Sequence, residues 1–306
     1  MILLLTRKIS GTSDMLMQVF AEQGVPAFRF NFDLFDHYKF QWTRDGFRFE
    51  DPMGRVCDSR DVTEMVFYKG LFSVDEPSDV DRNHEETKFV KSWMDALYHC
   101  FVRYGMERNL IRLIHPNPTT WAKTWQMEAA EKYFPVPEFM FHFGFAPESK
   151  EVITKNLTGR IFTTGDALMA SVVDRSKLDP AYPWFTQDIA PGTRDATVLY
   201  VNGNVHCFQF ATERSDCTDW RITQGTDANR WEPWDAGAEF EEKVRRYMRD
   251  MGLMFGRLDF IIGGEEPQFL EVNPCGQFGW LDDEEHLTLH HEVAAAILDP
   301  STTLRL

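Results

Sequence analysis

Residues 256–282 read GRLDFIIGGEEPQFLEVNPCGQFGWLD, and this is the most informative stretch of the chain. It contains two apolar segments of strand length, and each carries acidic or amide side chains where a buried strand normally carries none. Asp259 interrupts the first segment, and Glu271 and Asn273 alternate with apolar residues in the second. Side chains alternate between the two faces of a strand, so Glu271 and Asn273 are neighbours on one face. We expect all three oxygen-bearing side chains to share one face of a sheet.

Two carboxylates and an amide oxygen among apolar residues indicate a cation site. Burying a carboxylate is costly unless a positive charge compensates it, and oxygen ligands suit a hard divalent cation. Magnesium is the natural candidate, because carboxylates commonly hold it while substrate phosphates complete its shell. The alternative is that Asp259 and Glu271 are solvated residues on the exposed face of a hairpin. The following NPCGQFGW favours the site, because Pro274 and Gly276 end the strand and a turn follows.

The motif D-x11-E-x-N-P followed by a GQFGW-like segment resembles the ATP-grasp ligases. The resemblance is closest to the peptide-modifying branch that makes graspetides, the microviridin-type cyclic peptides. It implies that Asp259, Glu271 and Asn273 bind the magnesium ions of ATP. The spacing by itself predicts a magnesium and nucleotide centre, and the assignment of ligands comes from the resemblance.

Composition limits the class of protein. The chain has 306 residues, enough for a substantial core divided into two or three lobes. Its five cysteines form no Cys-x-x-Cys pair and no Cys/His cluster, so neither a zinc site nor a disulfide framework is expected, and a cytoplasmic location fits best. No apolar run approaches the roughly 18 residues that span a bilayer, so no membrane partner is expected. The net charge of −16 argues against nucleic acid as a partner.

The sequence predicts an α/β protein, and the resemblance implies the three parts of an ATP-grasp fold. Residues 1–115 are expected to form an N-terminal, pre-ATP-grasp α/β domain. Residues 116–188 are expected to form a central lid subdomain, and residues 189–306 a C-terminal catalytic subdomain. The segment His-Pro-Asn-Pro at residues 115–118 marks the first boundary.

Hydrophobic patterning predicts the elements of the first part. Strands are expected at residues 2–5, 27–30 and 65–68, and a helix over 15–23 follows a loop over 7–14. The residues between the second and third strands include Gly46, Pro52 and Gly54 and are expected to form a loop. A long amphipathic helix is predicted over 85–104, closed by Gly105. One stripe of this helix is expected to lie in the core, at Phe89, Trp93, Leu97 and Phe101.

The later parts are predicted in the same way. Thr119 is expected to cap a helix that runs to Tyr133, and residues 139–143 and 151–155 are expected to form strands. Residues 197–210 predict a hairpin, and residues 215–235 a loop. A helix over 238–251 is expected to turn four residues toward the core, namely Phe240, Val244, Tyr247 and Met248. A final helix is predicted over 284–298.

Two lysines are candidates for phosphate binding. Lys155 follows an apolar strand, a position from which a lysine reaches a phosphate as a point charge, although such a lysine is usually only solvated. The resemblance implies that Lys123 and Lys155 both contact the nucleotide phosphates. The loop over 158–165 can fold over those phosphates, and the chain contains no Walker motif and no G-x-G-x-x-G motif.

The segment over 184–192 matches the hinge of the resembled family, where backbone groups bind adenine. The resemblance therefore implies nucleotide contacts for Gln187, Asp188 and Ile189, and ribose contacts for Asp195. Many relatives have Asp-x-Arg at this point, whereas this chain has Asp195-Ala196-Thr197. The missing arginine leaves open a homologue that binds its ligands without catalysis.

Asp219-Trp220-Arg221 matches a second marker of the family. Carboxylate activation needs a cation that holds a carboxylate or acyl phosphate in one orientation, and a guanidinium offers a bidentate fork. The alternative is a surface salt bridge between Asp219 and Arg221. The resemblance favours catalytic roles for Asp219, Arg221 and Lys155. Cys275 is interpreted as structural, because no histidine lies at a partner position.

The resemblance implies an ATP-dependent carboxylate ligase that uses ATP and Mg²⁺. Its substrate is expected to be a ribosomal precursor peptide with a leader and an acidic core. Asp or Glu side chains are activated as acyl phosphates and joined to Ser or Thr hydroxyls or Lys amines, which gives macrocyclic esters or amides. One alternative adds a free amino acid to a small acid or protein tail, and another binds nucleotide or peptide without catalysis. Members of the family are often dimers, so a homodimer stays open.

Overall fold

The computed structural model describes residues 1–69, 84–116, 122–144, 148–155, 170–213, 231–283 and 285–305. The chain forms two compact units. Unit 1 contains Met1–Asn117, Leu253–Phe255 and Pro274–Leu306, and unit 2 contains Pro118–Gly252 and Gly256–Asn273. The C-terminal segment therefore packs with N-terminal residues, and the division at residues 115 and 188 stays a prediction.

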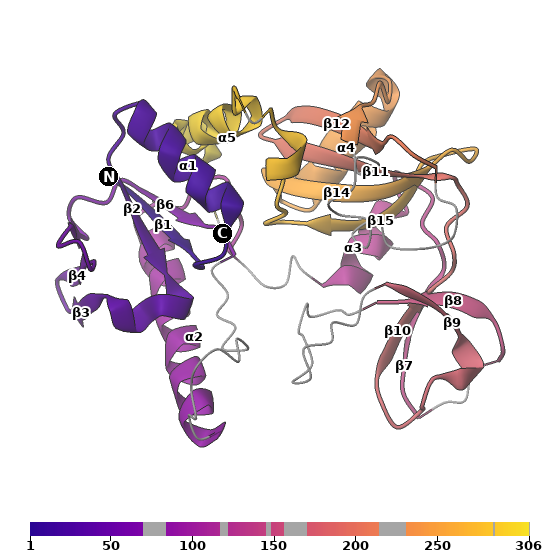
Figure 1. The fold of residues 1–306 in the computed structure, drawn as a ribbon, viewed down its shortest axis with the longest axis horizontal. Coiled ribbons are helices and arrows are strands. Elements are labelled where there is room, and N and C mark those ends of the chain that lie inside the picture. The colour runs from indigo at the N-terminus through magenta and orange to yellow at the C-terminus, as the bar shows by residue number, and fades with distance from the viewer. Residues whose placement is uncertain are drawn as a thin grey trace. The chain divides into compact units, whose positions relative to one another are not determined.

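Unit 1 is built on a parallel three-stranded sheet in the order β2-β1-β6. Its strands are β1 (Ile2–Thr6), β2 (Ala27–Asn31) and β6 (Glu64–Phe67), close to the predicted ranges. Helices α1 (Gly11–Glu22) and α5 (Thr288–Leu298) lie side by side, with α2 (His84–Glu107) on the other side of the sheet (Figure 1). The described part of this unit also contains the 3-10 helices η1 (Phe32–His37), η5 (Gly279–Leu281) and η6 (Pro300–Thr302).

Two predictions for the N-terminal region were wrong. The loop expected over 7–14 ends earlier, because Ser10 caps α1 and its side chain accepts the N–H of Ser13. The loop expected before β6 contains an antiparallel sheet in the order β3-β4-β5. Its strands form because Phe47 and Phe49 are buried in the core, and they are β3 (Lys39–Thr43), β4 (Gly46–Glu50) and β5 (Val56–Asp58).

The predicted core stripe of α2 was also partly wrong. Phe101 is fully buried, but Phe89 and Trp93 are 61% and 64% exposed. Residues four apart rotate by about 40° per step around a helix of 3.6 residues per turn, so a stripe of this spacing leaves the buried face. Gly105 does not end the helix but lies inside it, where a Cβ would come within 2.7 Å of the Ile111 side chain.

Unit 2 contains two sheets (Figure 1). The four-stranded sheet is antiparallel in the order β7-β10-β8-β9, with β7 (Phe139–His142), β8 (Glu151–Thr154), β9 (Ser171–Asp174) and β10 (Trp184–Gln187). The five-stranded sheet has the order β13-β12-β11-β14-β15, with β11 (Arg194–Val201), β12 (Asn204–Phe210), β13 (Trp231–Pro233), β14 (Phe255–Ile262) and β15 (Gln268–Asn273). Among its described residues, unit 2 has the helices α3 (Lys123–Ala130) and α4 (Ala238–Asp250) and the 3-10 helix η3 (Arg175–Lys177).

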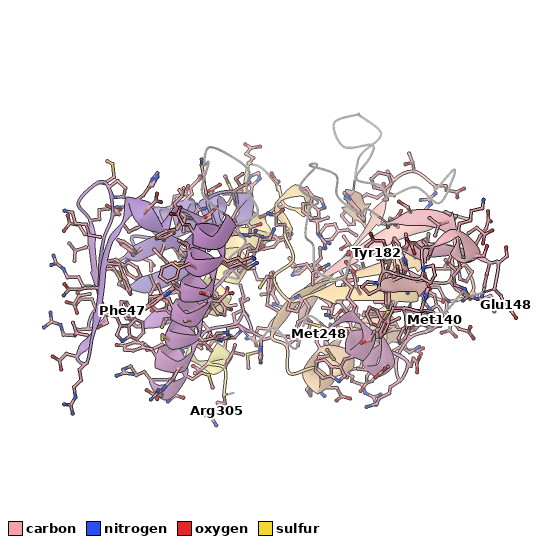
Figure 2. The ribbon with its side chains drawn as sticks, turned by 90° about the horizontal axis from the view of Figure 1, so that it is seen from below. Phe47, Met140, Glu148, Tyr182, Met248 and Arg305 are labelled. Atoms are coloured by element: carbon pink, nitrogen blue, oxygen red, sulfur yellow. The ribbon has the colours of Figure 1, made fainter. Side chains whose placement is uncertain are left out.

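Most predicted elements of the later chain are confirmed. The hairpin is β11 and β12, and the predicted core face of α4 is buried, including Met248 (Figure 2). The loop prediction was wrong at β13, which pairs with β12. Helix α3 ends at Ala130, before Tyr133, and Thr119 lies outside the described residues. The last helix begins at Thr288 instead of residue 284, because Asp282 accepts the N–H groups of Leu289 and His290.

Within the described ranges, no helix is both long enough and apolar enough to cross a membrane.

Candidate functional site

The three side chains predicted to share a face do lie together. Strands β14 and β15 are antiparallel, with Asp259 opposite Glu271 and Arg257 opposite Asn273. The amide nitrogen of Asn273 donates to Glu271 Oε1 at 3.1 Å and to Asp259 Oδ2 at 3.3 Å. An asparagine amide offers oxygen as well as nitrogen, so a half-turn of the same group presents an oxygen ligand.

A β-bulge sets the direction of Glu271. The register shifts between Asp259 and Phe260, so that Phe260 pairs with Phe269 and Leu270 has no partner across the ladder. Simple alternation would put Phe269 and Glu271 on the same face. Because of the bulge, Phe269 packs into the core, and its ring centroid lies 5.6 Å from that of Phe260. Glu271 instead faces Asp259. Bulges commonly re-aim side chains in this way next to functional sites.

Three cations compensate the two carboxylates. Lys123 Nζ lies 2.8 Å from Glu271 Oε2, and Arg257 Nη2 lies 2.9 Å from Asp259 Oδ2. Burial would raise the pKa of Glu271, but the charges of Lys123 and Lys155 and the hydrogen bonds from Lys123 and Asn273 outweigh it. The pKa of Glu271 therefore lies well below its usual value, and the carboxyl is ionised at neutral pH.

Helix α3 holds Lys123 against strand β15. Gln126, one turn after Lys123, is 1% exposed, and its Oε1 accepts the N–H of Val272 at 3.3 Å. Strand β15 is an edge strand, so this N–H points away from its ladder and needs a partner. The carbonyl oxygen of Gln126 accepts the buried hydroxyl of Tyr247 at 3.2 Å, which ties α3 to α4.

Strand β11 adds a hydroxyl to the same face. Thr197 is 1% exposed, and its Oγ1 lies 2.9 Å from Asp259 Oδ1. By strand alternation Asp195 points to the same side as Thr197, so the predicted ribose ligand lies on the face of the cluster. Thr197 occupies the place where the family resemblance leads one to expect an arginine. Arg257 donates to Oδ2 of the same carboxylate at 2.9 Å.

The predicted adenine-binding residues lie at the end of β10. Gln187 is 2% exposed, and its Nε2 has no hydrogen-bond partner within the part of the chain that the structure describes. The N–H of Asp188 already donates to the carbonyl of Glu138 at 2.7 Å, and its carboxylate pairs with Lys150 at 2.6 Å. Asp188 can therefore offer its carbonyl but not its N–H to a base, and Ile189 follows it directly.

Other predicted residues fall elsewhere. Asp219 and Arg221 lie outside the described residues, as does the loop over 158–165. Lys155 directly follows β8, and its N–H donates to the carbonyl of Phe185. Cys275 is buried in unit 1 and donates to the carbonyl of Phe67, and burial raises the pKa of its thiol to about 11. These contacts fit the structural interpretation of Cys275.

The donor set fits magnesium. The cluster offers two carboxylates and one amide. Within the described ranges, no three or more His, Cys, Asp or Glu side chains form a group that could hold a metal ion. The carboxylate and amide oxygens of the cluster are hard donors, and each carboxylate lies within 2.9 Å of a cationic side chain. Magnesium commonly takes one or two carboxylates and leaves further positions to water and phosphate.

Comparison with solved structures decides the fold. A RiPP-associated ATP-grasp ligase from Chryseobacterium gregarium, in complex with ADP and a leader and core peptide, has a TM-score of 0.76 at 18% identity. The match covers 100% of this chain and 99% of that chain. The chain has the ATP-grasp fold.

Two other structures are similar over nearly their whole length. The macrocyclase MdnC bound with the precursor peptide MdnA, from Microcystis aeruginosa MRC, has a TM-score of 0.76 at 19% identity, covering 97% of this chain and 99% of that chain. The ATP-grasp ligase PsnB with a minimal precursor, Mg and ADP has a TM-score of 0.70 at 12% identity, covering 98% and 97%. No protein-family model and no curated protein matches the sequence. The predicted α/β class and ATP-grasp fold are thereby confirmed.

Sequence reasoning missed three residues of the cluster. Arg257 precedes Asp259 by two positions, so strand alternation would have placed it on the same face. Gln126 follows Lys123 by three positions, which puts both on one side of a helix. Thr197 gives no such local signal, because its contact depends on β11 lying beside β14.

Proposed function

We propose that the protein is an ATP-dependent carboxylate ligase that acts on a ribosomally made precursor peptide. The single observation that carries the proposal is the cluster on β14 and β15, in which Asp259, Glu271 and Asn273 meet Lys123 and Arg257. Within an ATP-grasp fold, this is a site that holds a cation beside phosphate groups.

The oxygen ligands and the lysines have separate roles in this proposal. Asp259, Glu271 and Asn273 would hold Mg²⁺, which when bound would neutralise charge on the phosphate oxygens. Lys123 and Lys155 supply further positive charge toward the same phosphates. Lys123 is paired with Glu271 in this structure, and we expect it to turn to the phosphates in the nucleotide complex.

The nucleotide base is assigned to the end of β10. The buried Nε2 of Gln187 is a donor suited to a ring nitrogen, and the carbonyl of Asp188 is an acceptor suited to an exocyclic amine. Ile189 lies next to them as an apolar surface for the base, and Asp195 is assigned to the ribose hydroxyls. This arrangement explains why Gln187 is buried without a described partner.

The reaction proceeds in two steps. In this proposal Arg221 orients a substrate carboxylate, and Asp219 keeps the catalytic role that the resemblance implies. A carboxylate oxygen attacks the γ-phosphorus of ATP, the bond to the bridging oxygen breaks and ADP leaves. A hydroxyl or amine then attacks the acyl phosphate carbonyl, inorganic phosphate leaves, and the nucleophile gives up its proton. The product is an ester or amide, and the peptide has lost one water for each link.

The peptide substrate is proposed from the comparisons. Similar structures hold a precursor peptide, or a leader and core peptide, and the matches cover nearly all of both chains. Acidic side chains joined to Ser, Thr or Lys side chains of one peptide would give macrocycles. A homodimer and a cytoplasmic location stay predictions.

Mass spectrometry tests the proposal. A candidate precursor peptide, acidic in its core, is incubated with the enzyme, ATP and Mg²⁺. Loss of one water for each link, with one ADP formed per link, supports macrocyclisation. Addition of an amino-acid mass to the substrate would instead support the ligase for free amino acids.

Matched variants complete the test. Glu271→Gln is expected to abolish water loss and ADP formation, because it replaces an anionic magnesium ligand by a neutral amide. Glu265→Gln makes the same chemical change at an exposed position of the same hairpin and is expected to keep full activity. A wild-type protein that binds nucleotide and peptide but never releases ADP would point to the homologue without catalysis.

A further inference from the structure

Asp259 is held by donors of two kinds. Its Oδ2 accepts from Arg257 at 2.9 Å and from Asn273 at 3.3 Å, and its Oδ1 accepts from Thr197 at 2.9 Å. Arg257 and Asn273 flank the same cluster and, under the proposed function, face the phosphates and the cation. Thr197 comes from the neighbouring strand β11 and is 1% exposed.

The hydroxyl of Thr197 has a single hydrogen to donate. Two acceptors are in range, Asp259 Oδ1 at 2.9 Å and the carbonyl oxygen of Leu258 at 3.2 Å. Hydrogen bonds to ionised acceptors are shorter and roughly twice as strong as those to neutral ones. The distances and the charge therefore both direct the hydrogen to the carboxylate.

Thr197 is also the donor least able to move. A β-branched side chain has few χ1 states, and this one is enclosed in the five-stranded sheet. Under the proposed function the Asn273 amide turns to present its oxygen to the cation, and the Arg257 side chain has more rotatable bonds than a threonine. A fixed donor on Oδ1 leaves the direction of the carboxylate unchanged during that rearrangement.

We infer that Thr197 is a positioning residue for the cation site, whose hydroxyl fixes the Asp259 carboxylate in the orientation that binds the divalent ion of the nucleotide. The inference rests on the proposed function, since it assumes that Asp259 is a ligand. It assigns the ion's affinity partly to a residue that touches neither the ion nor the phosphates. Hydrogen-bond partners of metal-binding carboxylates commonly contribute in this way.

Two pairs of proteins isolate the hydroxyl. The first pair is wild type and Thr197→Val, because valine keeps the shape of threonine but has no hydroxyl. The second pair is Thr197→Ser and Thr197→Ala. Both of these lack the threonine methyl group, and only serine has a hydroxyl. Mn²⁺ binding to each protein with ADP is measured by electron paramagnetic resonance, and ADP binding is measured separately in the presence of a chelator. Thr197→Val is expected to bind Mn²⁺ about 10- to 100-fold more weakly than wild type, and Thr197→Ala more weakly than Thr197→Ser by a similar factor.

The second measurement separates positioning from general damage. ADP affinity without metal is expected to be the same in all four proteins, because a distorted sheet would weaken both ligands. Thr302→Val serves as the matched control. Thr302 is a buried threonine of unit 1, and its hydroxyl lies 2.8 Å from the carbonyl oxygens of Ala296 and Asp299 instead of near a carboxylate. It is expected to bind Mn²⁺ as wild type does.

The outcomes are distinct. Equal Mn²⁺ affinity in wild type and Thr197→Val, or in the Ser and Ala variants, overturns the inference and leaves the proposed function standing. Parallel loss of metal-free ADP binding also overturns it, because the hydroxyl would then be structural. Failure of the wild-type protein itself to bind Mn²⁺ with ADP overturns the proposed function and the inference together.

Discussion

Glu271→Gln perturbs the charge balance of the site while keeping the shape of the side chain. The cluster contains three cations, Lys123, Lys155 and Arg257, and two carboxylates, Asp259 and Glu271. The balance is three minus two, or +1, and the substitution makes it three minus one, or +2. Stability is expected to fall, because Lys123 loses its nearest opposite charge.

The size of the effect follows from the pair distance. Two charges 2.8 Å apart attract by 332/(20 × 2.8), or about 6 kcal/mol, at an effective dielectric constant of about 20. Desolvation of both groups offsets much of this attraction, and the glutamine oxygen still accepts a hydrogen bond from Lys123. A hydrogen bond to a charged group contributes about 1.5–3 kcal/mol net, so we expect a loss of about 2 kcal/mol at pH 7.

The loss is expected to depend on pH in a defined direction. The pKa of Glu271 is lowered in the folded protein, while an unfolded glutamate has a pKa of about 4.3. A lowered pKa means that the carboxylate stabilises the fold above the unfolded value. That stability is lost as the pH falls below about 4.3 toward the folded value. Glutamine does not titrate, so the difference between the variant and wild type should shrink on acidification.

Urea denaturation of both proteins at pH 7 and at pH 3.5 measures this difference. Glu265→Gln, exposed in the same hairpin, should stay within about 0.5 kcal/mol of wild type at both pH values. A Glu271→Gln protein as stable as wild type at pH 7 would refute the reasoning. So would a difference of the same size at both pH values.

Two further predictions concern Gln126 in unit 2 and the buried Cys275 in unit 1. Gln126→Leu leaves the outward N–H of Val272 without its partner, so the free energy of unfolding measured with urea should fall by about 1–3 kcal/mol. The KM for ATP should rise, because helix α3 would no longer hold Lys123 as firmly against β15. Gln126→Glu keeps the acceptor and should lose less, and equal behaviour of the two variants would contradict this role. In native protein at pH 7.5, iodoacetamide should modify the exposed Cys100 and spare Cys275, whose pKa burial raises to about 11. Peptide mapping that finds both modified at the same rate would show that Cys275 is accessible.

Local periodicity predicted that the three oxygen-bearing side chains of the cluster lie on one face of the sheet. Asp259, Glu271 and Asn273 share a face because strand alternation holds near the paired positions. The same rule fails at Phe269, which joins the core because a bulge at Leu270 removes one residue from the alternation. A bulge depends on the register of two strands, and a single strand's pattern does not contain it.

Long-range contacts account for what sequence reasoning missed. Thr197 contacts Asp259 although the two residues are 62 positions apart in the sequence. The contact exists because β11 lies beside β14 in the sheet. The segment after Asn273 packs with the N-terminal sheet, where the hydroxyl of Tyr68 donates to the carbonyl of Gly276. Neither contact has a local signature, because both depend on which strands and segments become neighbours in the folded chain.

Helix α2 makes the limit of pattern reasoning measurable. Phe89 and Phe101 belong to one stripe at four-residue spacing, and the pattern predicts equal burial for both. The structure has Phe101 fully buried and Phe89 61% exposed, because that spacing drifts by about 40° per step around the helix. Phe101→Ala should therefore cost about 3–5 kcal/mol in urea denaturation, as large-to-small changes in a core do. Phe89→Ala should stay within about 0.5 kcal/mol of wild type, since its main aromatic neighbour, Trp93, is exposed as well. If Phe89→Ala cost as much as Phe101→Ala, the exposed face of α2 would have to be covered in the folded protein.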